Sequence, residues 1–142
     1  MKIPYGLNNF KDVITESYLY IDKTAYIAAL EQEGKFNILL RPRRFGKSLF
    51  LSTLWHYYDV RHKDQFEQLF SGLAIGEAPT PLRNSYQVLF MEFSGIRDND
   101  TATILEDFLF EIRKRLRIFL EDYQYPQEDN NFSLLYCWYR QL

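Results

Sequence analysis

The chain has 142 residues, of which 46% are hydrophobic and 18% aromatic, and its formal net charge is −2. This apolar content suffices for the core of one compact domain and excludes a disordered chain, and the slight negative charge argues against nucleic-acid binding through bulk charge. The single cysteine, Cys137, excludes the small proteins that are held together by disulfides. The sequence lacks a signal-peptide pattern and any run of about 20 apolar residues, so we expect a cytoplasmic protein with no membrane partner.

The apolar pattern predicts alternating helices and strands. In chain order, we expect a helix at residues 8–17, a strand at 18–21, a helix at 25–33, a strand at 36–40, a helix at 47–58, a helix at 62–70, a strand at 87–93, and helices at 100–123 and 131–142. Asn8 can cap the first helix and Asp22 or Thr24 the second, whose end is marked by Gly34.

The predicted buried surfaces point to an α/β fold. Residues 36–40 are apolar almost without interruption, which is typical of a strand covered on both faces in a parallel sheet. The helix at 47–58 has one apolar face, formed by Leu51, Leu54, Trp55 and Tyr58. The helix at 100–123 has a longer apolar stripe, formed by Leu105, Phe108, Leu109, Ile112, Leu116, Phe119 and Leu120. Strands joined by such helices imply right-handed crossovers.

A basic turn with the sequence RPRRFGKS lies between the strand at 36–40 and the helix at 47–58. Its end has the parts of a phosphate-binding loop: Gly46 lets the backbone approach an anion, Lys47 can reach phosphate oxygens, and Ser48 can hold Mg²⁺. Arg41 and Pro42 stand where such a loop usually opens with glycine, and Pro42 removes one amide donor. We therefore expect the phosphate donors to begin near residue 44.

The remaining charges of the turn leave its role open. The guanidinium groups of Arg43 and Arg44 can bind phosphate oxygens in place of the lost amide. The same charges are also compatible with a solvated turn that binds nothing, or with contacts to nucleic-acid phosphates.

Four segments together resemble the AAA-ATPase-like family of prokaryotic P-loop proteins: YLYIDKTAYIAAL, LLRPRRFGKSLFLSTLWHYYD, QLFSGLAI and VLFMEFSG. The resemblance covers nearly the whole chain in the right order, and RPRRFGKS is similar to the family's own version of the phosphate loop. It implies a P-loop-NTPase-like, three-layer βαβ core, here with few strands and an incomplete parallel sheet. A lead-in segment at 1–34 would precede a βαβα core at 35–142. Many longer members of the family carry a PD-(D/E)XK-type nuclease-like domain.

The resemblance also implies the ligands and the residues that bind them. ATP would be the nucleotide and Mg²⁺ the metal, with Lys47 stabilising the charge on the phosphates and Ser48 as the metal ligand. The residues expected to line the nucleotide are Arg43, Arg44, Phe45, Gly46, Lys47, Ser48 and Leu49. The Asp22-Lys23-Thr24 run also matches the family, and we favour a structural cap by Asp22 or Thr24 as its role.

One departure limits the expected activity. Family members place a strand ending in an acidic pair after the last helix seen here, and this sequence stops at Leu142 before such a strand. Those carboxylates would hold Mg²⁺ and orient the attacking water. Glu92 could stand in for them, although a structural hydrogen bond suits it better.

We therefore expect ATP binding with little or no hydrolysis. A non-catalytic interaction module, which would dimerise or complete itself with the rest of a longer chain, and a nucleic-acid-binding turn are the alternatives.

Overall fold

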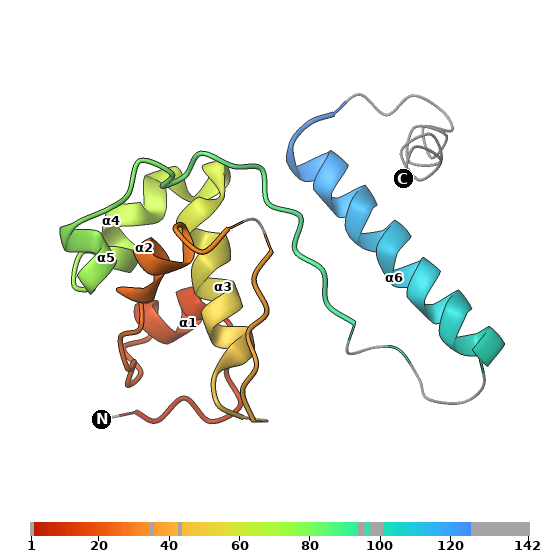
Figure 1. Ribbon diagram of the computed structural model, residues 1–142, viewed down its shortest axis with the longest axis horizontal. Helices are drawn as coiled ribbons and strands as arrows, with labels where there is room; N and C mark the ends of the chain where they lie inside the picture. Colours follow the sequence, from red (N-terminus) through yellow and green to blue (C-terminus); the bar gives the residue numbers. More distant parts are fainter. Residues whose placement is uncertain (1, 35, 43, 94–95, 97–100, 126–142) are drawn as a thin grey trace. The chain divides into compact units, whose positions relative to one another are not determined.

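The computed structural model describes residues 2–34, 36–42, 44–93, 96 and 101–125. It divides into two compact units at residue 88, and each is described by itself. The helices of the first unit are α1 (Phe10–Thr15), α2 (Tyr26–Leu30), α3 (Lys47–Tyr58), the 3₁₀ helix η1 (Val60–Gln65), α4 (Phe66–Phe70) and α5 (Ala74–Glu77) (Figure 1). The second unit contains one long helix, α6 (Thr101–Asp122).

The described residues are helical and form no strand, so the predicted α/β fold with a three-layer βαβ core and an incomplete parallel sheet is wrong for this structure. Strand-like pairing among them is limited to two isolated parallel bridges, Lys2 with Tyr18 and Asp59 with Tyr86. An apolar run becomes a strand only where a neighbouring segment exchanges backbone hydrogen bonds with it. Residues 18–21 are paired only through the bridge to Lys2, and no strand forms at 36–40 or 87–93 among the described residues.

The segment at 36–40 shows the error most clearly. It was expected to be covered on both faces, but Phe36, Ile38 and Leu40 are 95%, 85% and 85% exposed. Apolar composition alone predicted burial here, and burial requires a partner surface that the described residues do not supply.

Several predicted helices are confirmed. The helices expected at 8–17, 47–58 and 100–123 correspond to α1, α3 and α6, with α3 at the predicted bounds. The cap of α1 is Asn9, whose side chain accepts a hydrogen bond from the Lys11 amide, and not Asn8. The helix expected at 62–70 is divided into η1 and α4, and α5 was not predicted. The helix expected at 131–142, including Cys137, lies outside the described residues.

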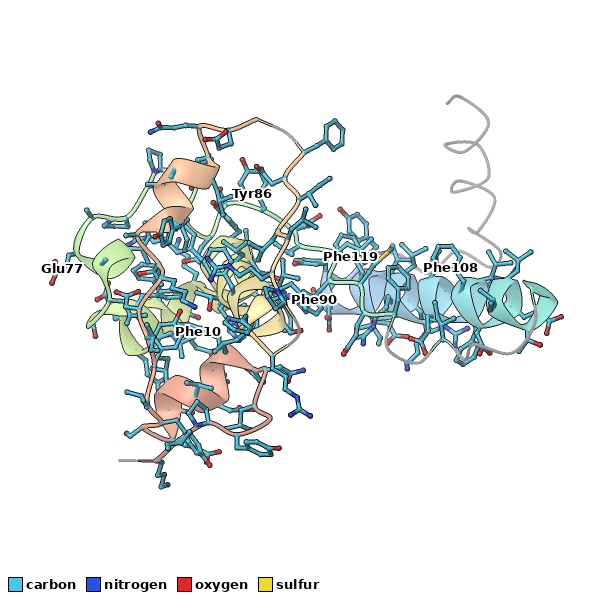
Figure 2. All side chains as sticks on the ribbon, turned by 60° about the horizontal axis from the view of Figure 1, so that its bottom comes forward. Phe10, Glu77, Tyr86, Phe90, Phe108 and Phe119 are labelled. Carbon is cyan, nitrogen blue, oxygen red and sulfur yellow. The ribbon has the colours of Figure 1, made fainter. Side chains whose placement is uncertain are left out.

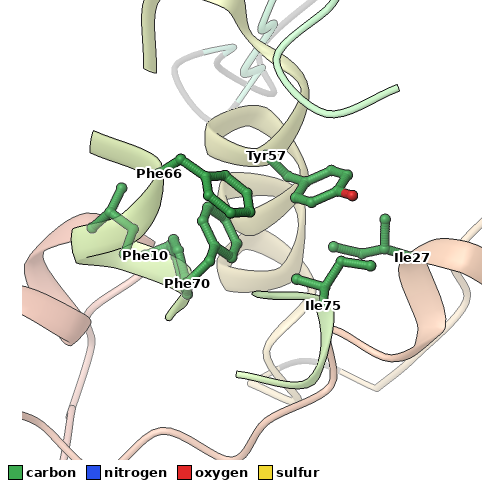
Figure 3. Close-up of a cluster of buried hydrophobic side chains, with 7 residues drawn as sticks. Phe10, Ile27, Tyr57, Phe66, Phe70 and Ile75 are labelled. Atoms are coloured by element: carbon green, nitrogen blue, oxygen red, sulfur yellow. The ribbon is translucent and has the colours of Figure 1, made fainter. Parts of the chain in front are cut away.

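The core of the first unit is an aromatic and aliphatic cluster contributed by five short helices (Figure 3). Phe70 of α4 lies at its centre: its ring centroid is 5.0 Å from Phe10, 5.6 Å from Tyr57 and 5.0 Å from Phe66. Ile27 and Ile75 complete the cluster from α2 and α5 (Figure 3). Such ring pairs add to the free energy gained from burial, which allows short helices to form a stable unit together.

The buried face of α3 is not the predicted one. Its buried residues are Ser52, Thr53, His56 and Tyr57, whereas Leu51 is 46% exposed and Leu54, Trp55 and Tyr58 are half-buried. The polar groups on this face are paired: the Ser52 hydroxyl accepts a 3.0 Å hydrogen bond from the Phe10 amide, and Thr53 donates to the Leu49 carbonyl. These hydrogen bonds offset most of the free-energy cost of burying the hydroxyls. Helix α1 packs against this side of α3.

The second unit has no comparable core among its described residues. None of the described side chains of α6 is fully buried, so the predicted buried stripe is only half-covered. Phe108 and Phe119 project from the same side of α6 (Figure 2), and Phe108 stacks on Phe93 at 5.2 Å. None of the described helices combines the length and apolar character needed to cross a bilayer.

Candidate functional site

The turn before α3 has an unusual backbone. Gly46 is the N-cap residue directly before α3, and it adopts the left-handed conformation, with φ of 74°. Arg44 is also left-handed, with φ of 66°, although it has a side chain. Phe45 between them does not have a positive φ, so the two left-handed residues are separated by one residue that is not left-handed. Successive amides in turn conformations can point toward one side and make a concavity that binds anions.

The first amides of α3 are not capped by a side chain. The amides of a helix's first turn have no carbonyl partner within the helix. Gly46 and Ser48 are exposed, and a Cβ added at Gly46 would meet nothing within 4 Å. The turn therefore presents amide donors to an open space.

The Lys47 ammonium is folded back over the front of the loop. It donates to the Arg41 carbonyl at 2.6 Å and to the Pro42 carbonyl at 3.0 Å. Both acceptors are uncharged, and in the described part of the chain Lys47 makes no salt bridge. Its positive charge is therefore available to an anion in the turn.

Two cavities adjoin this turn, and both are lined by Gly46. The larger one, of about 670 Å³, is lined by two segments, residues 3–8 and residues 44 and 46–49. This lining contains the cations Arg44 and Lys47 and no aspartate or glutamate. A cavity with cations on one wall and no carboxylate favours an anionic ligand.

The smaller cavity, of about 260 Å³, has a more apolar wall. It lies between α2 and the segment before α3, and its lining includes Tyr26, Leu30, Phe45 and Phe50. Its charged residues are Lys23, Arg41 and Glu33, so a carboxylate partly offsets the two cations. The two cavities thus differ in charge as well as in size.

The structure brings together most of the residues predicted to line the nucleotide. Arg44, Gly46, Lys47, Ser48 and Leu49 all line the larger cavity. Phe45 is 61% exposed and lines the smaller one. Arg43 lies outside the described residues.

Glu92 belongs to the second unit, where its carboxylate is 3.4 Å from the Arg115 guanidinium. Its proposed stand-in role for the acidic pair stays a prediction. The described residues contain no group of three or more His, Cys, Asp and Glu side chains arranged around a metal position.

Residues 3–8, which also line the larger cavity, were missed as site residues. The sequence predicts only a lead-in segment for these residues. Gly6, with φ of 74°, turns the chain here, and Tyr5 is 87% exposed. A tyrosine between a proline and a glycine was the available signal, but only the tertiary structure brings it to the same cavity as the Gly-Lys-Ser turn.

The Asp22-Lys23-Thr24 run has a structural role, but it is not the predicted cap of α2, which begins after Ala25 without a side-chain cap. The Asp22 carboxylate accepts hydrogen bonds from the Thr24 amide, the Thr24 hydroxyl and the Ala74 amide, at 2.8, 2.7 and 2.8 Å. Burial opposes ionisation of Asp22, but these hydrogen bonds outweigh it and hold the pKa of the carboxyl below its usual value. The Thr24 hydroxyl also accepts from the Ile75 amide at 3.1 Å. The run therefore joins the turn before α2 to the start of α5.

The fold and the site define a helical unit with a Gly-Lys-Ser turn at a cationic cavity. The profile of the AAA-ATPase-like family, described as "Predicted AAA-ATPase", matches residues 4–141, and the chain belongs to this family. A protein of Azotobacter chroococcum mcd 1, named "Uncharacterized protein in vnfD 5'region", is 38% identical over 100 residues. These residues cover 68% of this chain and 18% of that protein, so the chain matches only a small share of the relative's length. No solved structure matches the chain.

Proposed function

We propose that this chain binds the phosphate groups of ATP together with Mg²⁺ at residues 44–48. The observation that carries the proposal is the left-handed backbone at Arg44 and Gly46, which leads into the uncapped amides of α3. Strained backbone conformations are found mostly at functional sites. The free amides at the start of a helix bind phosphate groups. Membership in the AAA-ATPase-like family supports ATP as the source of that phosphate.

The side chains fit this role. A phosphate oxygen entering the turn would draw the Lys47 ammonium away from the two carbonyls that it now contacts, because a charge-assisted bond is stronger than a bond to a neutral acceptor. Arg44 adds a second cation at the same wall. The exposed Ser48 hydroxyl, at the second position of α3, would hold Mg²⁺ together with the phosphate oxygens.

Binding with little turnover is the expected activity. Hydrolysis requires groups that orient the attacking water and complete the metal shell. No carboxylate lines the larger cavity, so nothing on its walls would serve as that group. Phosphate release from ATP by this chain should therefore remain close to the uncatalysed background.

Thermal unfolding with and without Mg-ATP tests the proposal. Ligand at 100 times its dissociation constant should stabilise the native chain by about 2.7 kcal/mol. Lys47→Ala should abolish this stabilisation, whereas Lys23→Ala, at the smaller cavity, should retain it. Ser48→Ala should weaken Mg-ATP more than metal-free ATP. A folded native chain that Mg-ATP does not stabilise would contradict the proposal.

An interaction module is a second candidate, supported by the exposed apolar segment at 36–40. Phe36, Ile38 and Leu40 are all exposed within five residues, and proteins commonly bury exposed apolar groups of this kind against a partner. A second copy of the chain would be the simplest partner. Sedimentation at increasing concentration should then show a dimer that Ile38→Lys converts to a monomer. A native chain that stays monomeric would remove this candidate.

A further inference from the structure

The larger cavity is lined by two segments of opposite character. Residues 44 and 46–49 supply cations and amide donors. Residues 3–8 carry no charge, and two of their apolar side chains are open to solvent: Ile3 is 71% exposed and Tyr5 is 87% exposed. An anionic group suits the first segment and an apolar group suits the second, so a molecule with both parts would fit this cavity.

The uncharged wall is anchored at both ends. At its start, the Leu19 amide donates to the Lys2 carbonyl at 2.8 Å, and Lys2 is bridged to Tyr18. Beyond its end, the Phe10 amide donates to the Ser52 hydroxyl of α3 at 3.0 Å, and the Phe10 ring is fully buried. The segment is therefore tied to the same helix that begins at the phosphate turn. A preformed wall lowers the ordering cost of binding.

We infer that residues 3–7 form the site for the nucleobase of a nucleoside triphosphate, with Tyr5 as the stacking side chain. This inference rests on the proposed function, because the phosphates must be held at residues 44–48 for the base to reach residues 3–7. Aromatic side chains bind bases by stacking whatever the base, since every base has a flat π surface. The site therefore selects a nucleotide over a bare chain of phosphates and does not by itself select among the bases.

The smaller cavity is the competing location. It is also lined by Gly46, and it offers two exposed aromatic side chains, Tyr26 and Phe45, each 61% exposed. It is less favourable for a nucleotide because Glu33 would lie near the anionic ligand. Tyr26 is therefore a matched control for Tyr5: both are exposed tyrosines at the walls of cavities that adjoin the turn.

Calorimetric titration of two ligands separates the two parts of the site. Mg-ATP has phosphates and a base, and inorganic tripolyphosphate with Mg²⁺ has phosphates alone. Tyr5→Ala should weaken Mg-ATP binding by about tenfold, the effect of losing one base-stacking contact. The same variant should leave tripolyphosphate binding unchanged, and Tyr5→Phe should restore ATP binding. Lys47→Ala should weaken both ligands.

Other outcomes would overturn the inference and identify which part failed. If Tyr26→Ala, and not Tyr5→Ala, selectively weakens Mg-ATP, the base occupies the smaller cavity. If Tyr5→Ala weakens both ligands equally, or neither, residues 3–7 do not hold a base while the phosphate site stands. If the native chain binds neither ligand, the proposed function fails as well. Because Tyr5 is 87% exposed, its variants should unfold at the native temperature without ligand, which excludes misfolding as the cause.

Discussion

In its second half, α3 buries Thr53, His56 and Tyr57 among the neighbouring helices, whereas its first turn faces two open cavities. The buried half has ordinary helical backbone and paired polar groups. The exposed end begins with two left-handed residues, Arg44 and Gly46, and uncapped amides. One helix therefore joins a region selected for packing to a region that tolerates strain, and only the second has the features of a binding site. Four predictions test this contrast.

The largest effect should come from the core that packs against the buried half of α3. Phe70→Ala removes a fully buried ring that contacts three other rings of the core, and it should lower the free energy of unfolding by about 3–5 kcal/mol. Urea denaturation measures this loss. The control is Leu51→Ala on the exposed side of α3, which should cost about 1 kcal/mol or less. Similar losses for the two variants would mean that the cluster is not the stabilising core.

Gly76→Ala tests how closely the core elements approach one another. A Cβ at Gly76 would lie 1.8 Å from the Phe70 carbonyl oxygen, a backbone atom that cannot rotate away. The unfolding free energy should fall by about 3 kcal/mol, at the upper end of overpacking effects. Gly72→Ala is the matched control, because a Cβ there meets nothing within 4 Å. Equal stability of the two variants in urea would show that α5 can move away at little cost.

Acid should lower the stability of the first unit through His62, a residue of η1 that stacks on His56 of α3. Burial, together with the neighbouring His56, lowers the pKa of His62 from 6.5 to about 4, and the two rings stack at 4.4 Å. Burial also lowers the pKa of His56. Between pH 6.5 and about 4 the unfolded chain takes up protons that the folded chain does not. The stability contributed by the neutral rings is therefore complete above pH 6.5 and is lost as the pH falls.

We expect a loss of about 2 kcal/mol from His62 over this interval, after allowing for its partial exposure to water. Urea midpoints measured between pH 7 and pH 4.5 give the dependence. His62→Leu should make the curve flatter, since it removes the titrating ring. If His62→Leu leaves the pH dependence of the urea midpoint unchanged, other groups cause the acid sensitivity.

The smallest effect should come from the exposed end. Gly46→Ala places a side chain on a left-handed residue and should cost about 1–2 kcal/mol in unfolding free energy, although the Cβ meets no atom within 4 Å. Gly46→Asn should cost less, because asparagine tolerates this conformation. Equal stability of the Gly, Ala and Asn chains would show that the turn adopts another backbone conformation in solution.

The sequence predicted some features well because they depend on neighbouring residues. The start of α3 at Lys47 follows from Gly46, and α6 follows from a long stretch with helical spacing. Local preferences of this kind need no knowledge of distant contacts. The predicted cap of α2 by Asp22 or Thr24 was wrong, because α2 begins after Ala25 without a side-chain cap and Asp22 instead accepts the distant Ala74 amide.

The errors share a different cause. The segment at 36–40 was assigned to a sheet from its apolar residues, and the buried face of α3 was assigned to Leu51 and its apolar neighbours. In both cases the outcome depends on which surface packs there. Ser52 is buried because its hydroxyl accepts the Phe10 amide, a contact between residues 42 positions apart that no local pattern encodes.

By itself, the sequence determined the family to which the chain belongs, the positions of its longest helices, and a Gly-Lys-Ser turn at the start of α3. These features depend on the order and spacing of neighbouring residues. Only the tertiary structure decided that the described residues pack as helices without a sheet, which side of α3 is buried, and that residues 3–8 line the same cavity as the turn. Such features depend on contacts between distant segments. These contacts contribute to stability only once the chain is folded, so the local sequence does not reveal them.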